Sequence, residues 1–134
     1  MAAVDWNRLR DSAIDVATGA YAPYSKFRVG AAGLVGDGRV VTGCNVENVS
    51  YGLSLCAECG VVSALHQTGG GRLVALVCVA GDGTPVMPCG RCRQVLYEHG
   101  GADLLIYHTD GPRPLSDLLP HAFGAGDLRG NSLG

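Results

Sequence analysis

The sequence predicts an α/β fold, a three-layer α/β/α sandwich in which helices pack on both faces of a sheet. Segments with helical periodicity alternate with short apolar segments typical of strands, and turns rich in glycine or proline separate them. With 47% hydrophobic and 16% charged residues, a chain of 134 residues can form one hydrophobic core. We therefore expect a single domain over residues 1–134, with 124–134 a mostly irregular tail.

The first expected elements are a helix and a hairpin. Asp5 can cap a helix whose apolar residues recur at steps of three and four as far as Ala20. Pro23 then breaks the period, because proline has no N–H to donate. Residues 29–35 and 39–43 flank a Gly-Asp-Gly turn, in which the Asp-Gly pair favours positive φ. These two segments predict paired strands.

The rest of the chain continues the alternation after a polar segment at 44–55, which predicts a surface loop of the kind that carries function. The expected elements are then a helix over 56–68 stopped by three glycines, a buried strand over 72–80, a helix over 89–99, a strand over 104–107, and a short strand with a helical turn in 114–119.

Composition excludes several classes of function. Ten basic and twelve acidic residues give a net charge of −2, so the electropositive surface that a nucleic acid requires is not expected. No apolar run approaches the ~20 residues that cross a bilayer, and the N-terminus lacks the pattern of a signal peptide. We expect a cytoplasmic protein with no membrane partner. Its six cysteines then indicate metal binding, catalysis or core packing before disulfides.

Three cysteines form a candidate metal site. Cys89 and Cys92 lie three residues apart, on the same side of the first turn of an expected helix, and Cys56 begins another. Helix N-termini lower thiol pKa values and so favour the thiolates that zinc requires. Three thiolates leave the fourth position of a tetrahedral zinc ion for water, as in catalytic sites. The pattern predicts one Zn²⁺ per chain.

Glu58 is the candidate general acid and base. It follows Cys56 by two residues, and such residues point to nearly opposite sides of a regular helix. Cys56 must therefore lie at the helix cap or before it if both side chains are to reach one metal site. From there the carboxylate of Glu58 could approach a water molecule at the metal.

Two motifs identify the chain with a known family. Cys-Ala-Glu at 56–58 and Pro-Cys-Gly-Arg-Cys-Arg-Gln at 88–94 resemble the zinc-dependent cytidine deaminases, in the small homotetrameric three-cysteine branch. The likeness extends along nearly the whole chain and implies that family's fold, with a mixed sheet. It implies hydrolytic deamination of free cytidine and deoxycytidine to uridine and deoxyuridine plus ammonia, a step of pyrimidine salvage. Zinc-bound hydroxide would attack C4, with Glu58 as proton shuttle.

The resemblance also implies how a nucleoside binds. Phe27 would pack on the pyrimidine, and Asn45 and Glu47 would hydrogen-bond the ribose hydroxyls. Tyr51 and Phe123 match aromatic residues that neighbouring subunits contribute to the site in related enzymes, so the active unit would be a homotetramer with shared sites. The implied substrate-binding residues are Phe27, Asn45, Glu47, Tyr51, Ala57 and Phe123.

Two alternatives remain open. Cys59 completes a second CxxC pair with Cys56, so four cysteines could close a purely structural zinc site. Against this, the 29 residues at 60–88 between the pairs exceed the usual spacing of about 15–20. The other alternative keeps the deaminase reaction but takes a cytosine-nucleoside antibiotic as substrate.

Cys59 also marks a departure from the family pattern, which commonly has arginine directly after Cys-Ala-Glu. That arginine helps to offset the thiolate charge, and we expect Arg91 or Arg93, together with the helix ends, to replace it. We interpret Cys59 as a thiol beside the ligands and not as a fourth ligand. Cys44 and Cys78 are expected in the core. The histidines are scattered in the sequence and are assigned no role; they are His66, His99, His108 and His121.

Overall fold

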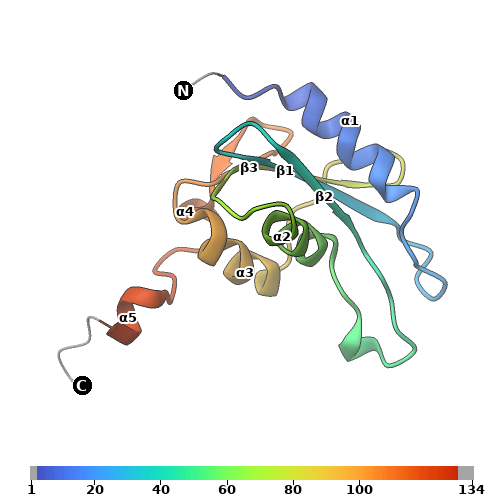
Figure 1. The fold of residues 1–134 in the computed structure, drawn as a ribbon. Coiled ribbons are helices and arrows are strands. Elements are labelled where there is room, and N and C mark those ends of the chain that lie inside the picture. Colours follow the sequence, from blue (N-terminus) through green and yellow to red (C-terminus); the bar gives the residue numbers. More distant parts are fainter. Residues whose placement is uncertain (1–2, 130–134) are drawn as a thin grey trace.

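The first helix and the hairpin form where the sequence predicts them. The computed structural model describes residues 3–129 (Figure 1). Helix α1 spans Trp6–Ala17, and the carboxylate of Asp5 caps it by accepting the backbone N–H of Arg8 at 3.1 Å. Strands β1 (Val29–Val35) and β2 (Val40–Cys44) pair in antiparallel fashion.

The sheet has five strands in the order β2-β1-β3-β4-β5. Strand β3 (Leu73–Ala80) lies antiparallel to β1, while β4 (Leu105–Ile106) runs parallel to β3 and β5 (Arg113–Pro114) antiparallel to β4. The sheet is therefore mixed, and the predicted α/β class is confirmed.

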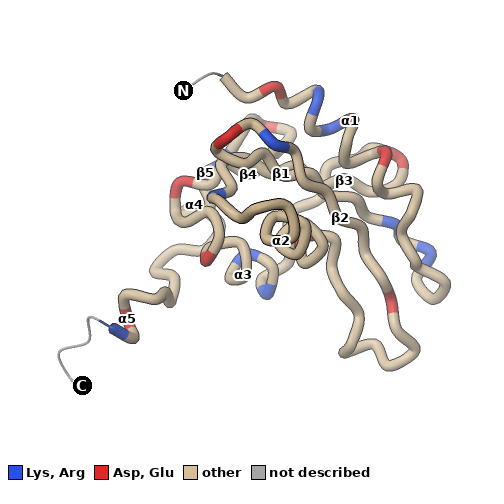
Figure 2. Tube along the Cα trace, viewed as in Figure 1, with Lys and Arg blue, Asp and Glu red and all other residues tan. Residues whose placement is uncertain are grey.

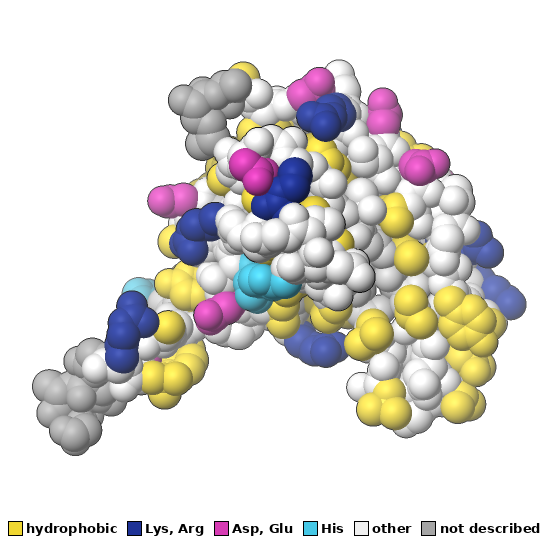
Figure 3. Space-filling model, viewed as in Figure 1, with side chains coloured by type: hydrophobic (Ala, Val, Ile, Leu, Met, Phe, Trp, Pro, Cys, Tyr) yellow, Lys and Arg dark blue, Asp and Glu magenta, His cyan; other side chains and the backbone are white. Residues whose placement is uncertain are grey.

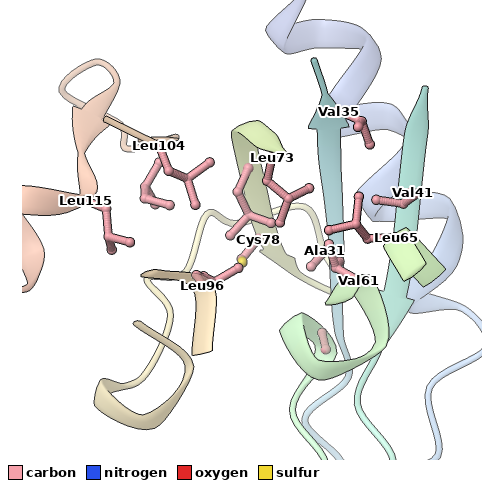
Figure 4. Packing of buried hydrophobic residues seen from close by; sticks show 13 residues of the cluster. Ala31, Val35, Val41, Val61, Leu65, Leu73, Cys78, Leu96, Leu104 and Leu115 are labelled. Atoms are coloured by element: carbon pink, nitrogen blue, oxygen red, sulfur yellow. The ribbon is translucent and has the colours of Figure 1, made fainter. Parts of the chain in front are cut away.

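Helices cover both faces of this sheet and produce three layers (Figure 1). Helix α1 packs on one face, where Leu9 and Ala13 meet Val77. Helices α2 (Ala57–Gln67) and α3 (Gly90–Gly100) cover the other face. There the buried side chains form a larger cluster, which Figure 4 shows in part: Val41, Val61, Leu65, Leu73, Cys78, Leu96, Leu104 and Leu115. The expectation that Cys78 is a core residue is confirmed.

Two segments differ from a simple sandwich. The polar segment 44–55 contains a 3₁₀ turn, η1 (Tyr51–Leu53), and extends away from the body in Figure 1. The expected strand and helical turn near 114–119 are present as β5 and α4 (Leu115–Leu118). None of the helices within residues 3–129 is both long and apolar enough to cross a membrane.

The tail contains more structure than the sequence predicts. Ala125–Arg129 form helix α5, where the backbone N–H of Gly124 donates to the Asp127 carboxylate at 2.8 Å and so begins the turn. Residues 130–134 of the tail lie outside the described residues. The assignment of 1–134 to one domain stays a prediction.

Candidate active site

Helices α2 and α3 each begin at a cysteine. Cys56 and Cys89 are the N-cap residues, both with extended backbone (φ −73°, ψ 157° and φ −66°, ψ 168°), and neither side chain makes a capping hydrogen bond. Their sulfurs are therefore free to turn toward each other. The prediction that Cys56 lies at the helix cap is confirmed, and it resolves how Cys56 and Glu58 can serve one site.

A glycine contact fixes the position of the first turn of α2. A Cβ added at Gly43 of β2 would lie 2.3 Å from the carbonyl oxygen of Ala57 and 2.7 Å from the carbonyl carbon of Gly60. Only a residue without a side chain allows the helix to approach the strand this closely. Gly43 thus sets where Cys56 and Glu58 lie relative to the sheet.

The three predicted cysteines come together. The Sγ atoms of Cys56, Cys89 and Cys92 all lie within 4.8 Å of one another, and those of Cys56 and Cys89 are 3.9 Å apart. Sulfurs bound to one tetrahedral zinc ion at ~2.3 Å would be ~3.8 Å apart, so the thiols fit this ion. Cys59 does not belong to the cluster that the described residues form. The ligand set is thus three cysteines, which contradicts the closed four-cysteine site.

The prediction that the helix N-termini lower the thiol pKa values is confirmed at only one of the three cysteines. The backbone N–H of Cys92 lowers the pKa of Cys89, as a helix N-terminus should. Burial raises the pKa of Cys56 and, further, that of Cys92, where the charge of Glu58 adds to the effect. Desolvation therefore outweighs the helix end at two ligands. A bound cation would reverse this balance, because a coordinating thiol loses its proton.

Glu58 lies in the first turn of α2 with only 5% of its surface exposed. Burial raises its pKa, against opposing hydrogen bonds from its own backbone and from the thiol of Cys78. Burial thus favours the protonated form of this carboxyl group, which is the direction that a proton-transfer group requires.

A cavity of about 270 Å³ opens beside the thiols and Glu58. The predicted residues Phe27, Asn45, Glu47 and Ala57 line it, whereas Tyr51 and Phe123 do not. The prediction missed part of the wall because its remaining residues, most of them ordinary apolar ones, carry no motif of their own. These missed residues are Val29, Ser54, Leu55, Val86 and Met87.

Asn45 and Glu47 hold the segment that carries Phe27. The Asn45 side chain accepts the backbone N–H of Val29 at 2.8 Å and donates to the carbonyl of Phe27 at 2.9 Å. The Glu47 carboxylate accepts the backbone N–H groups of Tyr24 and Ser25 at 3.0 and 3.1 Å and also the Ser25 hydroxyl. Hydrogen bonds from Ser25 hold the pKa of Glu47 below its usual value, so this carboxylate stays ionised in the cavity.

Arg91 and Arg93 differ in their contacts. Arg93 donates from Nε to the carbonyl of Pro88 at 2.8 Å and from Nη1 to that of Leu118 at 3.0 Å, and so ties the residue before Cys89 to helix α4. The side chain of Arg91 is exposed, and its backbone N–H contributes to the lowered pKa of Cys89.

Tyr51 lies on the 44–55 segment, and Phe123 lies between α4 and α5, on the second segment that extends from the body in Figure 1. Tyr51 is 74% exposed and Phe123 is 59% exposed, and the carbonyl of Phe123 accepts the Gln94 side chain at 2.7 Å. Apolar side chains gather on both segments in Figure 3, at the lower right and lower left. The exposed apolar residues of the 44–55 segment are Val46, Val49, Tyr51, Leu53 and Leu55.

The site combines three thiols that fit one zinc ion with a buried carboxyl group and an adjoining cavity. This combination defines the class of zinc-dependent hydrolases. Residues 5–109 match the family described as the cytidine and deoxycytidylate deaminase zinc-binding region. The chain belongs to this cytidine deaminase family.

Individual relatives agree with the family match. The chain is 72% identical over 125 residues to the cytidine deaminase of Mycobacterium tuberculosis, covering 93% of this chain and 94% of the relative. The crystal structure of the M. tuberculosis enzyme superposes with a TM-score of 0.90 over 91% of this chain and 99% of that one, at 72% identity. The structure of the Mycobacterium leprae enzyme gives a TM-score of 0.87 at 57% identity, over 89% of this chain and all of that one.

Proposed function

We propose that this chain deaminates free cytidine and deoxycytidine by hydrolysis, giving uridine and deoxyuridine plus ammonia for pyrimidine salvage. The observation that carries the proposal is the position of Glu58. Its buried carboxyl group lies in the wall of the 270 Å³ cavity together with Cys56 and Cys89, two of the three zinc-ligand cysteines.

Each group has a defined part in this reaction. A zinc ion held by Cys56, Cys89 and Cys92 supplies the Lewis acidity that makes water nucleophilic near neutral pH. Glu58 would take a proton from the attacking water and deliver it to ring N3, then take the proton of the new C4 hydroxyl and deliver it to the departing amino group, so that ammonia leaves as the C4 carbonyl forms. The burial that raises the pKa of Glu58 supports this role, because it makes the carboxylate a stronger base for the proton of the water.

The cavity favours a free nucleoside over a nucleotide. Of the residues that line it, Glu47 and Glu58 are acidic and none is lysine or arginine. Ionised Glu47 would repel a 5′-phosphate, whereas it can accept a hydrogen bond from a ribose hydroxyl. The Asn45 amide has a second N–H beyond the one given to Phe27, and it can donate to the sugar. Phe27 and Ala57 would then contact the pyrimidine.

The distribution of charge also argues against a polynucleotide substrate. Within residues 3–129, lysine and arginine positions are scattered along the trace and do not follow one another in a continuous track (Figure 2). A polynucleotide needs such a track for its phosphates.

We further propose a homotetramer in which Tyr51 and Phe123 complete the site of a neighbouring subunit. Both residues lie outside their own chain's cavity, on apolar segments that extend from the body. Contiguous exposed apolar surface of this kind is typical of an interface. Because these aromatic residues would lie in a neighbour's site, substrate binding would depend on assembly of the tetramer.

A cytoplasmic location is also proposed. All six cysteines are free thiols, and the three that fit zinc must stay reduced to bind it. Fractionation of the native cells with an antibody to the protein would test this location, and recovery outside the cytoplasm would contradict it.

Replacement of Glu58 tests the reaction. The Glu58→Gln variant keeps the shape of the side chain and removes its proton-transfer capacity, so it should bind zinc normally and lose turnover of cytidine by at least about a hundredfold. Ammonia release and zinc per chain are the measurements, with Cys59→Ser as a control that should remain active. Full activity of the Glu58→Gln protein would disprove the proposed role.

A substrate panel tests the specificity. Cytidine and deoxycytidine should be turned over, whereas CMP should react at least tenfold more slowly because of Glu47. Adenosine and an aminoacylated cytosine nucleoside complete the panel. Faster reaction of the antibiotic-type substrate than of cytidine would favour the alternative function.

The assembly has its own test. Light scattering coupled to size-exclusion chromatography should give the mass of four chains, and Phe123→Ala should raise the KM for cytidine several-fold. A monomer with full activity would exclude shared sites without affecting the proposed chemistry.

A further inference from the structure

Two histidines that are 33 positions apart in the sequence meet on the surface. Nε2 of His66 and Nδ1 of His99 lie 3.1 Å apart, and the ring centroids are 4.8 Å apart with an interplanar angle of 69°. His66 lies in the last turn of α2 and His99 in the last turn of α3. Figure 3 shows a group of histidine side chains near the centre of the visible face, apart from another histidine at the left.

The spacing of these nitrogens suits a metal chelate. Two imidazole nitrogens bound to one ion at 2.0–2.1 Å, with an angle between 90° and 109°, lie about 2.8–3.4 Å apart. The observed 3.1 Å falls within this interval. In the absence of metal, one ring donates to the other, so one of these nitrogens carries a proton. Binding requires that this proton move to the other nitrogen of the same ring, with no net release, and that the rings turn so that both nitrogens face one ion.

The helices hold the two rings in place. Leu65 directly precedes His66, Leu96 lies one turn before His99, and both leucines are fully buried in the same hydrophobic cluster. Two rings whose backbones are already held side by side lose less conformational entropy on binding a metal than rings on a mobile segment would.

The electrostatic surroundings contain contributions of both signs. The C-terminal ends of α2 and α3, which carry partial negative charge, converge here, and the carboxylate of Glu98 acts on His99. Burial and the neighbouring His66 lower the pKa of His99, which keeps its ring neutral and able to bind at pH 7. Arg39 opposes a cation, but its guanidinium is occupied by the carbonyls of Thr68 and Gly70 and by Asp37.

We propose that His66 and His99 together bind one divalent transition-metal ion, through Nε2 and Nδ1, at an accessory site distinct from the cysteine cluster. Water completes the coordination. The usual order of metal affinities for imidazole ligands predicts that Cu²⁺ binds more tightly than Ni²⁺, and Ni²⁺ more tightly than Zn²⁺. Helices of 11 residues separate this site from the cysteines by about 16 Å, so the two can be filled independently.

Titration of the zinc-loaded protein with Ni²⁺ tests the site. Calorimetry at pH 7.5 should show one Ni²⁺ per chain beyond the resident zinc, and His66→Gln and His99→Gln should each weaken this binding at least tenfold. The matched control is His108→Gln, which removes a histidine elsewhere. Zinc per chain, measured after the titration, should stay constant.

Three results would overturn the proposal: Ni²⁺ binding unchanged in both variants, equal weakening by His108→Gln, or uptake that matches the loss of zinc. Circular dichroism of each variant distinguishes lost binding from lost folding. In the wild-type protein, broadening of the His66 and His99 ring proton signals by Ni²⁺ gives a second measurement that needs no substitution. The deaminase assay plays no part, so this proposal and the proposed function fail separately.

Discussion

The two ends of the α2 and α3 pair carry opposite chemistry. At the N-terminal ends, Cys56 and Cys89 are caps and Cys92 lies in the first turn, all oriented toward one point. At the C-terminal ends, His66 and His99 meet. Helix dipoles favour anionic thiolates at the first end and neutral or cationic groups at the second. The two ends therefore differ in the charge that they favour, although burial outweighs this effect at Cys56 and Cys92.

Burial separates the two ends further. Glu58 and Cys92 are buried beside the core, and Gly43 of β2 contacts the backbone at the start of α2. His66 is exposed and His99 is half-buried. Buried groups respond strongly to substitution because solvent cannot replace lost contacts. We therefore expect large effects at the N-terminal ends and small ones at the C-terminal ends.

Removal of a zinc ligand should have the largest effect. In Cys92→Ser one sulfur is replaced by a poor zinc ligand, and loss of an outer partner alone already costs about 10–100-fold in affinity. We expect zinc affinity to fall at least about 100-fold, with loss of turnover, as measured by chelator competition and ammonia release. Cys59→Ser is the matched control on the same pair of helices and should keep its zinc. Equal loss of zinc in both would restore the four-cysteine site.

The glycine contact beneath α2 comes next. Gly43→Ala places a methyl group within 2.3 Å of the Ala57 carbonyl, and this backbone atom cannot rotate away. We expect a loss of about 3 kcal/mol in the free energy of unfolding, at the upper end of the usual range for overpacking. Urea denaturation gives the value. Gly52→Ala, where an added Cβ meets nothing within 4 Å, should be neutral.

Arg93 offers a smaller test at the same end of the helices. Arg93→Ala removes the hydrogen bonds to the carbonyls of Leu118 and of Pro88, which is next to Cys89, and should cost about 2 kcal/mol in stability. Zinc affinity should fall with it. Arg91→Ala is the control, since its side chain is exposed. Unchanged zinc affinity and pH–rate profile in both variants would show that neither side chain offsets the thiolate charge.

The sequence predicts the site at the N-terminal ends of α2 and α3 well, because the signals that specify each helix end lie close together in the sequence. Capping, motif spacing and the need to bring Cys56 and Glu58 together all lie within a few residues of each other. Cys56 is indeed the N-cap of α2. The same local rule failed for the thiol pKa values, because burial of Cys92 depends on strands and helices distant in the sequence.

The C-terminal ends show what the sequence cannot provide. His66 and His99 are single histidines in two helices, and only the packing of α2 on α3 brings their rings together. The same holds for Asn45 and Glu47, whose support of the Phe27 segment depends on a loop conformation that no spacing rule predicts. Contacts between distant segments need the assembled core.

The histidine pair should give the smallest effect, and one that depends on pH. The pKa of His99 lies below its ordinary value because burial and the neighbouring His66 disfavour the charged ring, while Glu98 acts in the opposite direction. Below about pH 6.5 the unfolded chain therefore binds more protons than the folded protein, and stability falls as the pH is lowered. His99→Gln removes the hydrogen bond to His66 and should lower the free energy of unfolding by about 0.5 kcal/mol at pH 7.5. Between pH 7 and 5, the free energy of unfolding of this variant should fall less than that of the wild type. Urea denaturation of zinc-loaded protein measures both, and His121→Gln, in an exposed turn, is the control. A wild-type pH dependence in His99→Gln would mean that the acid sensitivity does not arise at His99, and that the C-terminal ends of the helix pair do not contribute to it.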